Sequence, residues 1–194
     1  MKTTIKTTTA ALLVIGMLSC TKQNVSKPAT ENQPSSSDKA VAAFSIGQHF
    51  GGGIIFYIDN TNKHGLIAAV NDQGTGIAWY NGKNVVTSAT GTAVGTGNAN
   101  TTKIVNKQGK TGNYAALLCF KYKHDGFTDW YLPSKDELNL LFQQRNVVGG
   151  FSGENYWSSS EASRGKAWDQ EFGGGFQFKD SKFFTLNVRA IRSF

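Results

Sequence analysis

The sequence predicts an α+β fold whose main element is an antiparallel sheet. Short runs of β-branched and aromatic residues occur at 54–58 and again towards the C-terminus, and helical patterns lie between them. Only 17% of residues are charged, and glycine, threonine, serine and asparagine are frequent, which favours short strands and turns over a helical bundle. Aromatic residues make up 12% of the chain, too many for a disordered protein. The chain has two cysteines, which excludes disulfide-rich scaffolds and four-cysteine zinc sites.

Residues 1–19 have the pattern of a secretory signal peptide. Lys2 and Lys6 precede an apolar run, Ala10–Leu18, which is too short to span about 30 Å of hydrocarbon. Cys20 then resembles the lipidated cysteine of bacterial lipoproteins, and we predict lipidation there. An ordinary cleaved signal peptide with a cysteine nearby is the alternative. Thr21 stands where an aspartate would retain lipoproteins of enteric bacteria at the inner membrane, so the resemblance implies an outer-membrane lipoprotein, on the cell surface or the periplasmic face.

We expect a flexible tether over residues 20–43 and a single globular domain over 44–194. Residues 21–40 hold two of the three prolines and almost no large apolar side chain, so they cannot bury enough surface to fold. A flexible coil of about 20 residues reaches roughly 25 Å. The net charge of +7 includes five lysines and two acidic residues before residue 40, which leaves 15 basic and 11 acidic residues in the domain. These are spread along the sequence without a basic run, so we expect no nucleic-acid partner.

The first half of the domain reads as a hairpin followed by helices. Apolar runs at 54–58 and 66–70 flank a polar turn, which predicts two paired strands. The preceding Gly51-Gly52-Gly53 is not followed by a helix, so it indicates a tight turn or bulge and not a phosphate-binding loop. Residues 81–97 are polar and predict an irregular loop, after which we expect short helices at 98–107 and 113–120.

A third helix is predicted from Ser134 to about Arg145. Ser134 and Glu137 have the spacing of a capping box, and Leu138, Leu141 and Phe142 recur at helical spacing. After Gly149-Gly150 the pattern predicts strands at 156–158, 167–172, 176–178 and 183–194, with turns at 173–175 and 179–182.

Four separated sequence motifs of the domain, in this order, resemble those of one known family. They are Asp129-Trp-Tyr-Leu-Pro-Ser-Lys-Asp-Glu-Leu138, Tyr156-Trp-Ser-Ser-Ser-Glu161, Ala167-Trp168 and Val188-Arg-Ala-Ile-Arg192. Together with 52–56 and 64–69 they resemble the Lcl C-terminal domain family, over about residues 44–194. The resemblance implies a C-type lectin-like fold of the formylglycine-generating-enzyme branch, a twisted antiparallel sheet flanked by short helices. The ending also resembles variable proteins of diversity-generating retroelements, in which residues 162–186 would be the diversified stretch.

No group of residues has the pattern of a catalytic or metal site. Formylglycine-generating enzymes use a pair of cysteines in the C-terminal half, and here no cysteine follows Cys119, which we expect to be buried in a helix. The three histidines lack metal-binding spacing, and the calcium motifs of C-type lectins are missing. Asp136 and Glu137 fall in the first turn of a helix, where carboxylates favour the helix dipole. We therefore predict no enzyme activity, no metal and no cofactor.

Several large side chains in these motifs are expected to have structural roles. Trp130, Trp157 and Trp168 are predicted to be core residues, each burying on the order of 200 Å². Arg189 and Arg192 lie three apart on the last predicted strand and so point to opposite faces. We expect at least one of them to pair with a carboxylate or with loop carbonyls and fix the strand.

The phenylalanines are concentrated at the C-terminal end, where six of the 13 lie between residues 172 and 194. Phe176 and Phe178 share one face of a strand, with Gln177 on the other. If Gln177 is held inside by hydrogen bonds, both rings are exposed beside Lys179, Asp180 and Lys182, and such surfaces mark recognition sites. If Gln177 is outside, both rings are core. On the exposed interpretation the ligand-binding residues are Arg164, Lys166, Asp169, Phe176, Phe178, Lys179, Asp180, Phe183 and Phe184.

These observations predict a binding module and not an enzyme. We expect a lipid-anchored protein that displays its C-terminal strands and loops to a protein or glycan ligand, as an adhesin does, and contacts the membrane through the lipid. A structural envelope lipoprotein or surface-fibre subunit is one alternative. A periplasmic enzyme or assembly factor acting on glycans is another.

Overall fold

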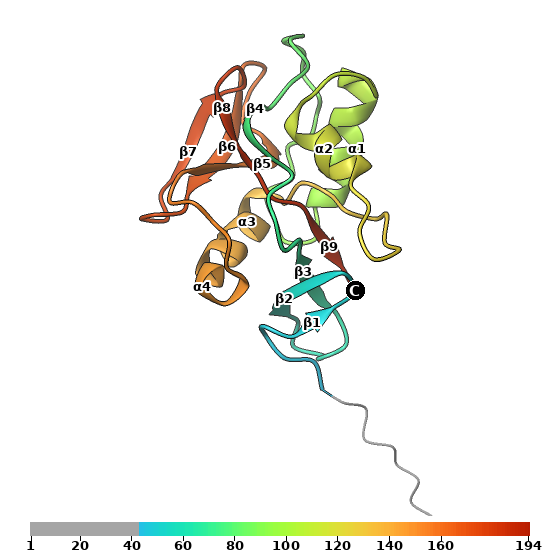
Figure 1. Cartoon of the computed structure of the whole chain (residues 1–194). Coiled ribbons are helices and arrows are strands. Elements are labelled where there is room, and N and C mark those ends of the chain that lie inside the picture. Colours follow the sequence, from blue (N-terminus) through green and yellow to red (C-terminus); the bar gives the residue numbers. More distant parts are fainter. Residues whose placement is uncertain (1–42) are drawn as a thin grey trace, which may run out of the picture. The chain divides into compact units, whose positions relative to one another are not determined.

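A computed structural model describes residues 43–194, in which two mostly antiparallel sheets are accompanied by short helices (Figure 1). The first sheet has the strand order β1-β2-β3-β9, from β1 (His49–Phe50), β2 (Gly53–Ile58), β3 (Gly65–Ala68) and β9 (Ile191–Ser193). The second has the order β4-β8-β5-β6-β7, from β4 (Gly74–Ala78), β5 (Asn155–Glu161), β6 (Lys166–Glu171), β7 (Gln177–Ser181) and β8 (Thr185–Val188). Within this sheet β5 and β8 pair in parallel, at Tyr156 and Asn187. The predicted α+β class is confirmed, but the strands form two mostly antiparallel sheets and not the one antiparallel sheet that the sequence predicted.

The helices lie on both sides of the second sheet's central strands. The helices α1 (Gly97–Gln108) and α2 (Ala115–Lys121) contact each other, α1 also contacts β5, and α2 contacts β4 and β8. The helix α3 (Lys135–Gln143) contacts β2, β5 and β6, so it joins the two sheets, and α4 (Arg145–Val148) follows it against β2 (Figure 1). In residues 43–194, none of these helices combines the length and the hydropathy that a membrane span requires.

Two clusters of buried side chains form the core. The larger one includes Trp79, Ile104, Trp130 and Trp157, and the smaller one includes Phe56, Leu138, Tyr156 and Phe172. The prediction that Trp130 and Trp157 are core residues is confirmed. Cys119 is buried in α2 as predicted, and burial raises the pKa of its thiol far above the ordinary value.

The predicted hairpin, tight turn and helices are confirmed in residues 49–143. Gly51 and Gly52 connect β1 to β2 with φ of +56° and +82°, a backbone region that favours glycine. The β2–β3 hairpin matches the two predicted apolar runs. At the start of α3, the Ser134 side chain accepts from the Glu137 N–H while the Glu137 carboxylate accepts from the Ser134 N–H, which is the predicted capping box.

Two elements in this part of the chain were not expected from the sequence. The strand β4 has the sequence GTGIA, in which Ile77 is the single buried residue, so it lacks the alternation that marks a strand; pairing with β8 holds it in place. The helix predicted to reach Arg145 ends at Gln143, and the separate short helix α4 begins at Arg145.

The predicted continuous strand over 183–194 is wrong, because the chain changes sheets there. Phe183 and Phe184 belong to the turn after β7, β8 joins the second sheet, and β9 joins the first. Arg189, which lies between β8 and β9, donates to Asp72 Oδ1 at 2.6 Å and to backbone carbonyls of Ala69 and Gly150. These bonds hold the crossing in place. The predicted polar turn at 179–182 is also shifted, since β7 continues to Ser181.

Both C-terminal arginines pair with carboxylates, which confirms the structural role predicted for them. Arg189 holds Asp72, and Arg192 donates to both carboxylate oxygens of Asp129 at 2.8 Å. The Arg192 guanidinium also holds the pKa of Asp129 below its usual value. The predicted signal peptide and all but the last residue of the predicted tether lie outside the described residues.

Candidate functional site

Exposed aromatic side chains gather at β7. This strand is the outer strand of the second sheet (Figure 1). Phe176 is 67% exposed and Phe178 44% exposed, and in the turn after the strand Phe183 is 62% and Phe184 45% exposed. Of the two interpretations of this segment, the exposed one is therefore correct. We call the β7 surface the six side chains Trp168, Phe176, Phe178, Lys179, Phe183 and Phe184. They surround the edge strand on both of its faces, because Lys179 and its register neighbour Trp168 project to the face opposite to Phe178.

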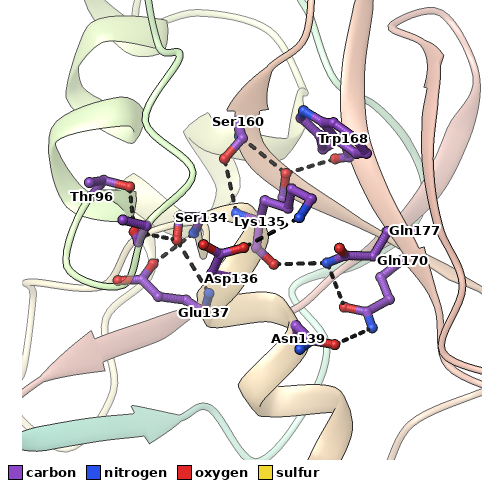
Figure 2. A network of polar contacts seen from close by, with 12 residues as sticks. Thr96, Ser134, Lys135, Asp136, Glu137, Asn139, Ser160, Trp168, Gln170 and Gln177 are labelled. Atoms are coloured by element: carbon purple, nitrogen blue, oxygen red, sulfur yellow. Dashed lines mark hydrogen bonds and ion pairs between the residues drawn. The ribbon is translucent and has the colours of Figure 1, made fainter.

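Gln177 explains why the two neighbouring rings face outward. Its amide donates to the Lys135 carbonyl of α3 at 3.1 Å and to Gln170 Oε1 at 3.3 Å. Gln170 in turn donates to Asn139 Oδ1 at 2.9 Å, so an amide chain ties β7 through β6 to α3 (Figure 2). Because Gln177 points inward, alternation along the strand turns Phe178 to the opposite face.

Gly175 fixes where the β6–β7 hairpin meets α3. Its φ is +87°, and a Cβ atom at this position would lie 2.5 Å from the Phe142 ring. Any other residue would be strained in backbone conformation and would push the hairpin away from the helix. The amide chain and this close approach hold the β7 surface on a rigid support.

Trp168 is a correction to the predicted core. It is half-buried on β6, directly beside Lys179 of β7 in the strand register. The Lys179 ammonium lies 4.8 Å from the ring centroid. The Lys135 ammonium lies 5.0 Å from the same centroid, and Figure 2 shows Lys135 beside Trp168. Two cations beside one indole ring make a part of the surface that combines apolar area with positive charge.

Lys182, expected at the rim of this surface, is instead buried. Its ammonium contacts Glu161 Oε1 at 2.5 Å and donates to the Arg164 carbonyl at 2.9 Å. Glu161 also accepts from the backbone N–H groups of Thr87 and Ser88, which satisfies its second oxygen. The sequence predicted an exposed lysine because Lys182 lies in a polar segment. Its buried carboxylate partner, Glu161, belongs to β5 and is distant in the sequence, which explains why the prediction was wrong.

This buried ion pair determines how the next two residues are presented. With Lys182 turned inward, Phe183 and Phe184 form the outer part of the turn, and their rings pack edge to face with centroids 4.9 Å apart. Phe176 precedes β7, Phe178 lies on the strand, and Phe183 and Phe184 follow it. The exposed rings are therefore distributed along the whole length of β7.

Asp169, also predicted to contact a ligand, does not lie on the surface. Its side chain is 1% exposed and accepts from Asn155 Nδ2 at 2.6 Å, while its Oδ1 atom has no partner within residues 43–194. Burial, with a smaller contribution from the nearby Asp180 carboxylate, raises its pKa to about 6. Asp169 lies on the same face of the sheet as its register neighbour Phe178, so strand alternation does not account for its burial; β6 lies inside the edge strand, and Asn155 of β5 contacts the carboxylate there.

The remaining predicted site residues flank the β7 surface. Arg164 and Lys166 are exposed near the Phe183–Phe184 end, and the Arg164 guanidinium donates to the Asn84 carbonyl at 3.1 Å. Asp180 is partly exposed on β7, on the same face as Phe178. The structure thus brings together eight of the nine predicted residues along one hairpin and its turns, and buries Asp169.

Sequence reasoning missed two features of the domain. The first is the contact between Lys135 and Trp168, because Lys135 comes from a helix and no sequence pattern links the two residues. The pairing of Trp168 with Lys179, by contrast, follows from the length of the β6–β7 turn. The second is a pocket of about 480 Å³ beside the first sheet, lined by residues that include Tyr57, Val94, Asn98, Tyr131 and Phe194. No motif marks this pocket, because its lining comes from segments that are far apart in the sequence.

Glu137, a buried carboxylate, has a structural role. Glu137 is buried in the capping box, and burial raises its pKa although the N–H groups of Ser134 and Gly95 oppose the shift. Across residues 43–194, no three histidine, cysteine, aspartate or glutamate side chains gather as they would around a metal ion.

Comparison with known proteins gives one family match. A family model described as the Lcl C-terminal domain matches residues 68–192. That range contains α1 to α4, five complete strands from β4 to β8, and every residue of the β7 surface. The search among curated proteins returns no match.

Proposed function

The chain belongs to the Lcl C-terminal domain family, and on that premise we propose that it is a lipid-anchored envelope protein whose folded domain binds a ligand on the β7 surface. The observation that carries the proposal is the exposure of four phenylalanines on one hairpin and its turns, at 44–67% each. Solvent-exposed aromatic groups of this density, rimmed by lysine and arginine, are typical of recognition surfaces.

The fixed geometry of the hairpin supports binding and not a disordered hydrophobic edge. The Gln177–Gln170–Asn139 amide chain and the Lys182–Glu161 ion pair hold the two ends of β7. A surface that is already ordered loses less conformational entropy when a ligand binds.

We also propose that the domain has the C-type lectin-like fold and no catalytic role. Support for the fold is that the early strands β1 to β3 and the last strand β9 share one sheet while the other sheet carries the ligand-facing hairpin. Support for a binding role is that the buried carboxylates Glu137 and Glu161 and the partly exposed carboxylate of Asp72 all accept structural hydrogen bonds. Reproducible hydrolase or transferase turnover by the purified protein, lost on changing one acid, would overturn this assignment.

We further propose that a retroelement diversifies the stretch 162–186. This range covers β6, β7 and the turn after it, so the residues that would vary include the whole β7 surface. The test is genomic: a nearby reverse-transcriptase gene and an imperfect repeat of the 3′ end of this gene are expected, and absence of both contradicts the proposal.

The binding experiment uses the full chain with Cys20→Ser, which removes the proposed lipid. Fluorescently labelled protein is applied to a glycan array and to an array of envelope and host-surface proteins. We expect saturable binding to at least one class, lost in the double variant Phe176→Ser/Phe178→Ser. The matched control is Phe120→Ser, because Phe120 is 38% exposed on α2 and lies outside the hairpin. Equal loss in both variants, or no binding to either array, would contradict the proposed function.

A further inference from the structure

We propose that β7 is a strand-addition site, at which an extended segment of a partner protein pairs with β7 and continues the second sheet. The inference rests on the proposed function and names its ligand class as a polypeptide. Recognition by strand addition takes its affinity from main-chain hydrogen bonds and its specificity from alternate side chains.

The strand register shows which backbone groups of β7 are open. The Glu171 N–H donates to the Phe176 carbonyl at 2.9 Å, and the Lys182 N–H donates to the Gly165 carbonyl at 3.0 Å. In an antiparallel pair hydrogen-bonded positions alternate, so Phe178 and Asp180 also bond to β6, whereas Gln177, Lys179 and Ser181 point their backbone groups away from it.

All but one of these outward groups have no partner in the described part of the chain. The Ser181 carbonyl accepts from the Phe184 N–H at 2.9 Å, which leaves three N–H groups and the carbonyls of Gln177 and Lys179 open. The strand order ends at β7, and Figure 1 shows it at the outer border of the second sheet. The edge therefore offers five hydrogen-bonding groups over five residues.

Natural edge strands are commonly protected by a lysine that projects past the edge, by proline or by a bulge. The β7 register is regular over Gln177–Ser181, and the segment contains no proline. Its one lysine, Lys179, lies back over the Trp168 ring at 4.8 Å and so leaves the edge uncovered. Exposed phenylalanines lie along the edge instead, and aromatic residues at an edge favour pairing with another strand.

The side chains of β7 indicate what the added strand would carry. Cross-strand pairs favour apolar residues opposite Phe176 and Phe178 and an acidic residue opposite Lys179. Lys135, Lys166 and Arg164 add positive charge around the edge. We therefore expect an extended partner segment that places β-branched residues opposite Phe176 and Phe178 and an acidic residue opposite Lys179.

A second copy of the chain fits this edge poorly. If two β7 strands paired around a two-fold axis through the middle of the strand, Lys179 would oppose Lys179 and Phe178 would oppose Asp180. Like charges directly opposite one another destabilise a sheet. We therefore expect the protein to remain monomeric under conditions in which it binds the partner strand.

The first measurement is amide hydrogen exchange of the full chain with Cys20→Ser. In the free protein the N–H groups of Gln177, Lys179 and Ser181 should exchange rapidly, and those of Phe178 and Asp180 at least about a hundredfold more slowly. Uniform protection along β7 would show that the edge is already covered and would overturn the proposal.

The second measurement is binding of a capped heptapeptide, acetyl-Thr-Lys-Glu-Val-Thr-Val-Thr-amide, followed by NMR. In antiparallel register it places valines opposite Phe176 and Phe178 and a glutamate opposite Lys179. We expect a Kd on the order of 1 mM or lower and slowed exchange at the three open N–H groups. The control peptide has the same side chains but is N-methylated at the residues opposite Gln177, Lys179 and Ser181, and we expect it to bind at least about tenfold more weakly.

The protein variants separate backbone pairing from side-chain contact. Lys179→Pro removes an open N–H at an edge position that tolerates proline, and Lys179→Ala keeps that N–H while removing the ammonium. We expect peptide binding to be lost in the first and largely kept in the second. If Lys179→Pro does not fold, the comparison of the unmodified peptide with the N-methylated peptide tests backbone pairing by itself.

Equal binding of the two peptides would overturn strand addition while leaving a side-chain recognition surface, and so the proposed function, intact. Absence of heptapeptide binding, or self-association of the protein in place of it, would also overturn strand addition. The proposed function fails on a different result, namely array binding that does not depend on Phe176 and Phe178.

Discussion

The ammonium of Lys182 contacts Glu161 Oε1 at 2.5 Å, and both side chains are at most 2% exposed. Lys182 directly precedes the two most C-terminal phenylalanines of the β7 surface, and Glu161 is the last residue of β5. The pair therefore connects the turn that carries Phe183 and Phe184 to the centre of the second sheet. Burial lowers the pKa of Lys182, and the hydrogen bond and charge of Glu161 oppose that shift.

Breaking this ion pair should destabilise the domain strongly. Lys182→Ala leaves the Glu161 carboxylate buried without its cation, and we expect the free energy of unfolding to fall by about 3–5 kcal/mol. Urea unfolding measures the change. Lys179→Ala is the matched control, since Lys179 is exposed, and it should cost less than about 0.5 kcal/mol. Similar costs for the two variants would contradict the assignment of Lys182 as a structural residue.

The exposed phenylalanines should tolerate polar substitution without loss of stability. Phe176→Ser and Phe178→Ser are expected to change the free energy of unfolding by less than about 0.5 kcal/mol, because neither ring fills the core. Trp157→Ala, at a fully buried position, should cost about 3–5 kcal/mol. Thermal unfolding compares the three variants. A collapse of Tm in both phenylalanine variants would place these rings in the core and remove the β7 surface.

Asp169 should contribute a loss of stability as pH rises from about 4 to about 6. Its folded pKa of about 6 exceeds the ordinary value of 3.8, so in this interval the native state holds a proton that the unfolded state has released. By linkage, the stabilisation is complete below the unfolded pKa and is lost as pH rises through the folded one, by about 2–3 kcal/mol in total.

Asp169→Asn provides the test of this pH dependence. The amide keeps an oxygen for the Asn155 side chain and cannot ionise, so the variant should lose this slope and be more stable than the wild type at pH 8. Urea unfolding at pH 5 and pH 8 measures the difference between the two proteins, which also removes the contribution of Glu137, whose pKa is raised in the same direction. An unchanged slope in Asp169→Asn would contradict the account.

The anchoring prediction concerns Cys20. Cys20→Ser should abolish labelling with a radioactive fatty acid and release the protein into the soluble fraction. The net charge of the domain gives only weak, salt-sensitive attraction to a membrane, so the lipid is expected to hold the protein. Cell fractionation in high salt is the measurement. A variant that stays with the membrane there would contradict lipid anchoring.

Local patterns predicted the elements whose determinants are local. The capping box at Ser134 and Glu137 and the apolar runs of β2 and β3 depend on residues close in sequence, and the structure confirms them. The inward position of Gln177 depends on a carbonyl of α3, so the sequence left both interpretations of its neighbours open.

Long-range partners account for the errors. Lys182 was expected at the surface because Glu161 lies 21 residues away, on another strand. Asp169 was expected to face a ligand because its burial depends on the register of β5, β6 and β7. The break in the last strand at Arg189 depends on Asp72, which is 117 residues distant. Charged residues in polar segments read as exposed unless their buried partner is known.

The central claim is that ligand recognition takes place on the β7 surface, and one paired measurement tests it most directly. For the ligand found on the arrays, the equilibrium Kd and the free energy of unfolding are determined on the same preparation of Phe176→Ser/Phe178→Ser. We predict a Kd at least about tenfold higher than that of Phe120→Ser, with unfolding free energies that agree within about 0.5 kcal/mol. An unchanged Kd in a stably folded double variant would contradict the claim.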